Sequence, residues 1–156
     1  MTDIKTIQLL LVGEAKTGKT LFTKKALGYD VDDHVLNHCI DGYYPTMGVE
    51  VHPHIYQYDY EYYRFNIWEL GGKIKNTNEA HYFSKCSEKI IAFYSNKDEY
   101  DKVTETLNKY VQETSDIYYL YNKKNGNQVM TEHADFILDL QNCSHQDICD
   151  IFDTIM

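Results

Sequence analysis

The stretch Gly13-Glu14-Ala15-Lys16-Thr17-Gly18-Lys19-Thr20 fits the pattern G-x-x-x-x-G-K-[ST] at every fixed position. Its flanks also fit, because residues 4–12 end in an apolar run long enough for a buried strand, and residues 21–27 have the character of a helix start. A strand, a glycine loop and a helix in this order are the context of a phosphate-binding loop. We therefore predict phosphate contacts from residues 13–20 and from Leu21, which follows them.

Each residue type in this loop has a chemical reason. Gly13 and Gly18 allow the backbone to turn successive N–H groups toward one anion. Lys19 would place a positive charge on the β- and γ-phosphates of a nucleotide, and the hydroxyl of Thr20 would hold Mg²⁺. The helix that follows offers the positive end of its dipole to the phosphates. The alternative is a chance loop between a strand and a helix, and the matching flanks argue against it.

Composition limits the class of protein. The chain has 156 residues, enough for one domain that we expect to span 1–156. A net charge of −9 argues against a nucleic-acid partner, since a phosphate backbone would be repelled. We see no signal-peptide pattern, no apolar stretch of transmembrane length and no cysteine placed for prenylation. The four cysteines lack close paired spacing, as is typical of reduced thiols. We expect an intracellular monomer, in the cytoplasm or nucleus, without a membrane anchor.

The order of the predicted elements indicates an α/β fold. Residues 49–58 and 61–70 favour an antiparallel hairpin with a turn at 58–61. Further strands are predicted at 89–94, 116–121 and 136–140, with a helix over 98–111 between the first two. Ser144 can cap a final helix whose inward face carries Ile148, Ile151, Phe152 and Ile155. Alternating strands and helices predict a mostly parallel sheet covered on both faces.

Two further stretches add a resemblance to a known family. Residues 46–53 read Thr-Met-Gly-Val-Glu-Val-His-Pro, and residues 65–68 read Phe-Asn-Ile-Trp. Together with the glycine loop, they resemble the Ras-like small GTPases and, among these, the Ran branch. The resemblance implies a P-loop NTPase fold of the Ras type, a three-layer α/β/α arrangement with a six-stranded, mostly parallel sheet and one antiparallel edge strand. It also implies GTP or GDP with Mg²⁺ as ligands.

The resemblance assigns roles to residues outside the loop. Thr46 would reach Mg²⁺ and the γ-phosphate in the triphosphate state only, and Tyr43 would close over the phosphates. The backbone N–H of Gly72 would sense the γ-phosphate. The metal would be held by Thr20 and Thr46, with Glu69 acting through a water molecule. Loss of the γ-phosphate would release both loops, and partner proteins could detect the difference.

Four positions depart from the family pattern. Glu69 stands where the family has aspartate, which keeps the charge but is one methylene longer. Lys73 occupies the position of the catalytic glutamine, and lysine cannot accept a hydrogen bond from the attacking water. The base-reading motif is Asn122-Lys123-Lys124-Asn125, in which Asn125 replaces a charged aspartate. The last base-contacting loop is lost near residues 141–143, so only the backbone N–H of Asn142 could still contact the base.

These residues support a switch with very slow GTP hydrolysis, whose partners are effector or regulator proteins. By resemblance alone, those partners would include nuclear-transport factors. One alternative is a pseudo-GTPase that presents the switch surface without turnover, and another is a hydrolase for a different nucleotide.

His34 and His38 could form a metal pair, but no cysteine set completes it, so we favour solvated loop histidines. The tyrosines at 56, 58, 60, 62 and 63 could form a partner surface; we favour a hairpin with tyrosines on both faces.

Overall fold

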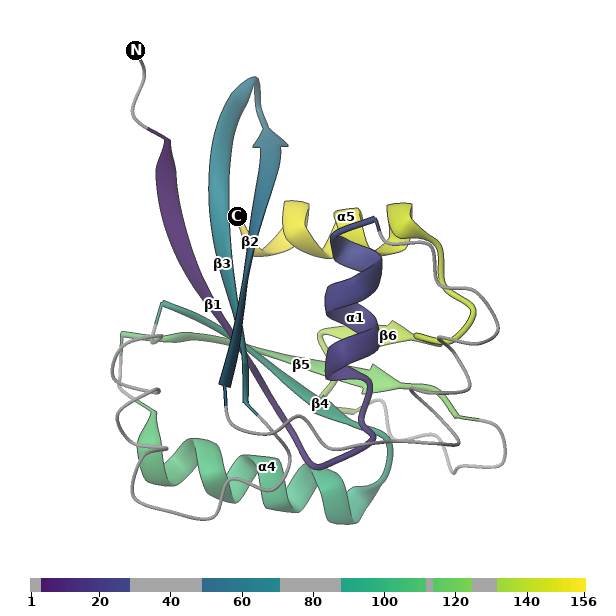
Figure 1. Ribbon diagram of the computed structural model, residues 1–156. Helices are drawn as coiled ribbons and strands as arrows, with labels where there is room; N and C mark the ends of the chain where they lie inside the picture. Colours follow the sequence, from purple (N-terminus) through teal and green to yellow (C-terminus); the bar gives the residue numbers. More distant parts are fainter. Residues whose placement is uncertain (1–3, 29–48, 71–87, 112–113, 125–131) are drawn as a thin grey trace.

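The computed structural model describes residues 4–28, 49–70, 88–111, 114–124 and 132–156 (Figure 1). Within these ranges the elements follow one another as predicted, with strand and helix ends displaced by a few residues at most. They are β1 (Lys5–Val12), α1 (Lys19–Ala26), β2 (Val49–Tyr58), β3 (Glu61–Leu70), β4 (Lys89–Tyr94), α4 (Lys97–Tyr110), β5 (Asp116–Asn122), β6 (Phe136–Leu138) and α5 (His145–Ile155).

The strands form one six-stranded sheet in the order β2-β3-β1-β4-β5-β6. Strand β2 pairs antiparallel with β3, and the other neighbouring strands pair in parallel. The mostly parallel sheet with one antiparallel edge strand is therefore confirmed. Ligands of such sheets bind beyond the carboxyl ends of the parallel strands, and the loop at residues 13–18 follows the carboxyl end of β1.

Alternation along β1 shows how the sheet separates two apolar layers. Leu9 and Leu11 are buried among apolar residues of α1 and α5 on one face of the sheet. Leu10 and Val12 are buried against α4 on the other face. Since successive side chains of a strand point to opposite faces, a continuous apolar run is what a strand buried on both sides requires. Figure 1 shows α4 on one face and α1 with α5 on the other. This confirms the three-layer arrangement.

The two longer helices begin at side-chain caps. Ser144 and Asp147 form a reciprocal capping box at the start of α5, and all four predicted inward residues of that helix are buried. Asn96 caps α4 by accepting a hydrogen bond from the backbone N–H of Glu99 at 2.9 Å. Asn96-Lys97-Asp98, which resembles a base-reading motif, therefore starts a helix here. Every helix in the described ranges is too short or too polar to cross a membrane.

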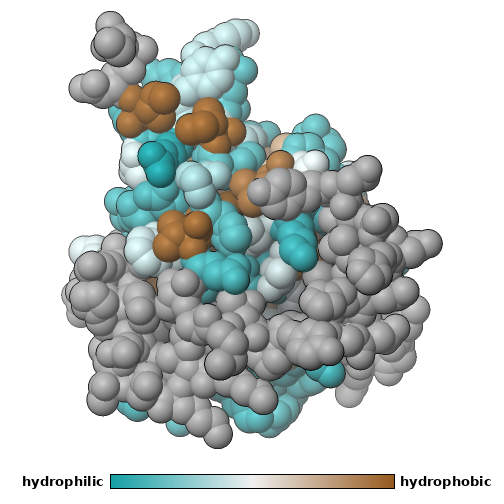
Figure 2. All heavy atoms as spheres, viewed as in Figure 1, coloured by the Kyte–Doolittle hydropathy of each residue, from teal (hydrophilic) through white to brown (hydrophobic). Residues whose placement is uncertain are grey.

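The β2–β3 hairpin extends beyond the other strands (Figure 1). Its two turn residues have positive φ, 50° at Asp59 and 66° at Tyr60, and the register pairs Tyr58 with Glu61. Tyr56 packs against Phe152 of α5, whereas Tyr60 and Tyr62 are exposed. The favoured interpretation of the tyrosines, with rings on both faces, holds for these residues. Figure 2 shows the exposed apolar residues of this region as separate brown groups among polar atoms.

Candidate nucleotide and metal site

The loop between β1 and α1 adopts a backbone that only glycine fits at two positions. Gly13 has a φ of 150° and Gly18 a φ of 103°. A Cβ atom at Gly13 would lie 2.7 Å from the carbonyl oxygen of Phe93, and one at Gly18 would lie 2.5 Å from Cδ1 of Leu140. Both positions therefore exclude side chains by conformation and by space. The hydroxyl of Thr17 closes the loop by donating to the carbonyl oxygen of Glu14 at 2.8 Å.

The amine of Lys19 lies inside this loop. Its Nζ donates to the carbonyl oxygens of Gly13 at 2.7 Å and Glu14 at 2.9 Å, and the residue is 4% exposed. Burial lowers the pKa of Lys19 to about 8, although the nearby carboxylates of Glu69 and Glu14 act in the opposite direction. An anion seated in the loop would therefore meet an amine that is already desolvated and directed by two carbonyl groups.

Thr20 and Glu69 meet at the edge of the loop. The Thr20 hydroxyl donates to Oε1 of Glu69, which lies at the carboxyl end of β3 and is 1% exposed. The other oxygen, Oε2, is buried and has no hydrogen-bond partner among the residues that the structure describes. Burial raises the pKa of this carboxyl, while the Thr20 bond and the charge of Lys19 oppose the rise. A hydroxyl beside a carboxylate with a free oxygen fits a hard cation such as Mg²⁺.

A comparison with known families agrees with this geometry. Residues 8–125 match the family model described as "Ras of Complex, Roc, domain of DAPkinase". The chain belongs to the Roc family. A Roc domain is a GTPase domain of the Ras superfamily, so the predicted Ras-type fold and a guanine-nucleotide-binding switch are supported at this level. The match gives no support to the finer resemblance to Ran.

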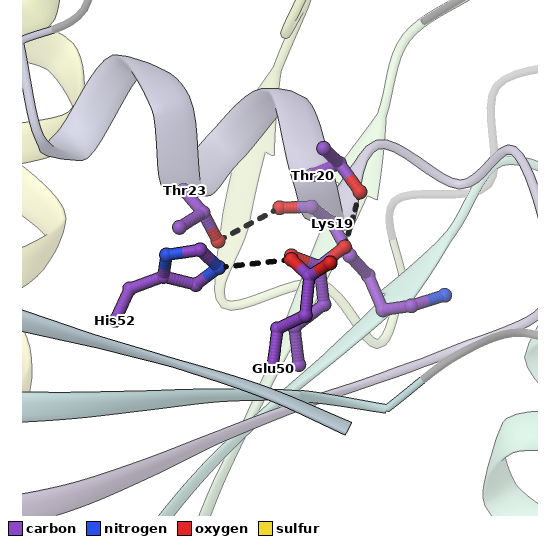
Figure 3. A network of polar contacts seen from close by, with 6 residues as sticks. Lys19, Thr20, Thr23, Glu50 and His52 are labelled. Carbon is purple, nitrogen blue, oxygen red and sulfur yellow. Dashed lines mark hydrogen bonds and ion pairs between the residues drawn. The ribbon is translucent and has the colours of Figure 1, made fainter. Parts of the chain in front are cut away.

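Two side chains of β2 approach the same part of this Roc domain. Glu50 and His52 point toward the start of α1, where Lys19 and Thr20 lie (Figure 3). Nε2 of His52 lies 3.2 Å from Oε2 of Glu50. From the sequence, neither side chain was assigned to this site. A signal was available, because the predicted turn at 58–61 places Glu50 directly opposite Glu69.

On the base side, Asn122 connects three parts of the chain. It is buried at the end of β5; its Nδ2 donates to the carbonyl oxygen of Thr17, and its Oδ1 accepts from the N–H of Leu140, both at 3.1 Å. This amide also lies against Gly18. Asn122 therefore holds the phosphate loop in place, whatever it contributes to the base. From the sequence, Asn122 was predicted only to contact the base.

Two other residues predicted to contact the base, Lys123 and Asn142, use their backbone N–H groups within the protein. The N–H of Lys123 donates to the carbonyl oxygen of Leu138 at 2.7 Å. The N–H of Asn142, the predicted base contact, donates to the carbonyl oxygen of Asp139 at 3.1 Å. Nζ of Lys124 donates to the carbonyl oxygen of Lys16 at 2.5 Å, so this side chain lies over the phosphate loop. A bound base would share or displace the Asn142 contact.

Several predicted residues lie outside the described ranges, and their roles stay predictions: Tyr43, Thr46, Gly72, Lys73, Asn125, and the His34 and His38 pair. Among the described loop residues, the side chain of Leu21 is buried in the core with α1 and α5. A contact from Leu21 to phosphate would therefore come from its backbone.

Proposed function

We propose that this Roc domain is a nucleotide-dependent switch that binds GTP with Mg²⁺ and hydrolyses it very slowly. The observation that carries the proposal is the contact between Thr20 and the buried Glu69 beside the loop that encloses Lys19. These are the positions at which a Ras-type domain needs a metal-binding hydroxyl, a carboxylate and a phosphate-binding amine.

Each residue has a part in binding. Lys19 would exchange its two carbonyl partners for the β- and γ-phosphates, and the loop N–H groups would surround the same anion. Thr20 would bind the metal directly, Glu69 through water, and Thr46 in the triphosphate state. Mg²⁺ held in this way would neutralise charge on the phosphates.

Slow hydrolysis follows from Lys73. A glutamine at this position both accepts from and donates to the attacking water, whereas an ammonium group can only donate. Glu69 also departs from the family, because its side chain is one methylene longer than the aspartate found at this position. We therefore propose that the triphosphate state persists, and that effector or regulator proteins bind it. The prediction that nuclear-transport factors are among these partners rests only on the resemblance at residues 46–53 and 65–68, and it stays a prediction.

The decisive variant is Lys73→Gln. We expect it to raise the rate of single-turnover GTP hydrolysis by up to about 100-fold, near the lower end of what a positioned catalytic group contributes. Phosphate release from preloaded protein measures this rate without a contribution from nucleotide exchange. Lys5→Gln removes an exposed lysine at the far end of β1 and is the matched control.

The competing function is a binding module without turnover. Lys19→Ala should abolish triphosphate binding if the loop binds phosphates, since the loop amine is removed. Protein purified without added nucleotide, then denatured and separated by ion exchange, should release GTP if the switch reading holds. Release of no nucleotide, together with no gain in Lys73→Gln, would instead favour the module.

A further inference from the structure

Three metal-ligating side chains meet on one face of the β2–β3 hairpin. Glu50 and His52 are two residues apart on β2, so their side chains share a face, and Glu69 of β3 lies opposite Glu50 in the register. One ligand atom from each residue, an imidazole nitrogen and two carboxylate oxygens, lies within 4.8 Å of the other two. Figure 3 shows the two β2 side chains directed toward the start of α1.

Glu69 supplies an independent sign that a ligand belongs here. Glu69 is 1% exposed, and its Oε1 accepts a hydrogen bond from the Thr20 hydroxyl. Oε2 has no partner within the described ranges. Buried polar atoms nearly always have a hydrogen-bond or metal partner. A cation among the three side chains would supply that partner.

We propose that Glu50, His52 and Glu69 form a binding site for a divalent first-row transition-metal ion beside the phosphate loop. The imidazole favours a transition metal over Mg²⁺ or Ca²⁺, and the two carboxylates favour the harder members of that series, such as Mn²⁺.

The geometry is close to that of a metal site. Metal bonds of about 2.0–2.2 Å place neighbouring ligand atoms roughly 3 Å apart. Nε2 of His52 and Oε2 of Glu50 are already 3.2 Å apart. The side chain of Glu50 is 51% exposed, so it can rotate toward Glu69 without disturbing the core. Three protein ligands and an exposed side leave further coordination positions for water.

This site goes beyond the proposed function, because its three ligands are protein side chains and no nucleotide is needed to complete it. It is coupled to the nucleotide loop through one carboxylate, since Glu69 is bonded to Thr20 by Oε1.

Mn²⁺ is the probe, and pulsed electron paramagnetic resonance is the measurement. Protein freed of metal by EDTA and of bound nucleotide, and checked for fold by circular dichroism, should bind one Mn²⁺ per chain and show the ¹⁴N modulation of a coordinated imidazole. The same protein with GDP should gain a ³¹P coupling from a second, phosphate-bound Mn²⁺. The nitrogen signal therefore tests the new site, and the phosphorus signal separately tests nucleotide binding.

The variants follow from the ligand set. His52→Asn should remove the nitrogen modulation, and Glu50→Gln should weaken Mn²⁺ binding at least about tenfold, since even outer-shell losses cost this much. His145→Asn is the matched control, because His145 is an exposed histidine of α5, outside the proposed ligand set, and its ring lies 3.4 Å from Sγ of Cys149. It should leave both readouts unchanged.

Three results would overturn the proposal. They are the absence of bound Mn²⁺ at millimolar concentration, bound Mn²⁺ without nitrogen modulation, and nitrogen modulation that survives His52→Asn or disappears in His145→Asn. A missing ³¹P coupling with an intact nitrogen signal would contradict the nucleotide proposal and leave the metal site supported.

Discussion

Lys19 shows how a single residue prepares this Roc domain for an anion. Its ammonium group is buried, with two backbone carbonyl groups as its closest partners. Burial penalises the charge, and the neighbouring carboxylates recover only part of that penalty, so the pKa is about 8. Phosphate oxygens would restore the stabilisation that water gives to an exposed lysine.

This leads to a pH dependence. We expect the affinity of nucleotide-free protein for GDP to fall as the pH rises above about 8. In the free protein the pKa of Lys19 is lowered from 10.5 to about 8, so above that pH the amine is mostly neutral and must take up a proton to bind phosphate. Between the free and bound pKa values, affinity should fall by up to about tenfold per pH unit. Below pH 8 this contribution is constant.

Isothermal titration calorimetry in two buffers of different ionisation enthalpy measures this proton uptake. Uptake of a proton at pH 9 but little at pH 7 is expected. Equal affinity and no uptake at both values would mean that the Lys19 amine stays charged in the free protein.

At the scale of elements, the turn of the β2–β3 hairpin contains an unusual choice of residues. Both central positions have positive φ, as in the two-residue turns that suit the twist of a hairpin, yet they are Asp59 and Tyr60. Aspartate tolerates this region, but a bulky side chain is strained there. Tyr60 is 93% exposed, so little packing compensates for the strain.

Tyr60→Gly should therefore stabilise the protein, by about 0.5–1 kcal/mol in the free energy of unfolding. The relief of left-handed strain exceeds the added chain entropy of glycine in the unfolded state. Chemical denaturation measures the change. Tyr62→Gly is the control, since Tyr62 is an exposed residue within β3, and glycine there should destabilise by a similar amount. A loss of stability in Tyr60→Gly would contradict this account.

At the scale of the whole molecule, Asn122 connects segments far apart in the sequence. Its amide bridges the phosphate loop at residue 17 and the end of the β6 region at residue 140. Lys25 adds a second link, because its Nζ donates to the carbonyl oxygens of Gln141 and Cys143. The loop that binds phosphates and the loop expected near the base are thus held as one unit.

Asn122→Ala should cost about 1–3 kcal/mol of stability, because it leaves the Leu140 N–H and the Thr17 carbonyl group buried without their partner. GDP affinity should fall as well, since the phosphate loop loses its support. Thermal unfolding and nucleotide titration measure the two effects. Asn108→Ala, which replaces an exposed asparagine of α4, should change stability by no more than about 0.5 kcal/mol. Loss of GDP affinity with unchanged stability would instead indicate a direct base contact.

The sequence predicts the frame of this site better than its contacts. The glycine pattern, the continuous apolar strand and the alternation of elements are local signals, and each one indicated the correct element. The pair Glu50 and Glu69 was also predictable, since a symmetrical turn at 58–61 fixes the register. The contact of Thr20 with Glu69, and the hydrogen bonds by which Asn122 joins Thr17 to Leu140, depend on how α1 and β6 pack on the sheet. No local pattern encodes those distances.

The position of β2 at the edge of the sheet gives Pro53 a further importance. Strand β2 is the outermost strand of the described sheet, and its exposed Val51 and Ile55 alternate with polar residues. Such an edge invites another strand to add to it, which is a common start of aggregation. Proline has no backbone N–H to offer to an incoming strand, and it is tolerated in edge strands for that reason. We therefore expect Pro53, which is exposed midway between Val51 and Ile55, to disfavour self-assembly of the chain into fibrils.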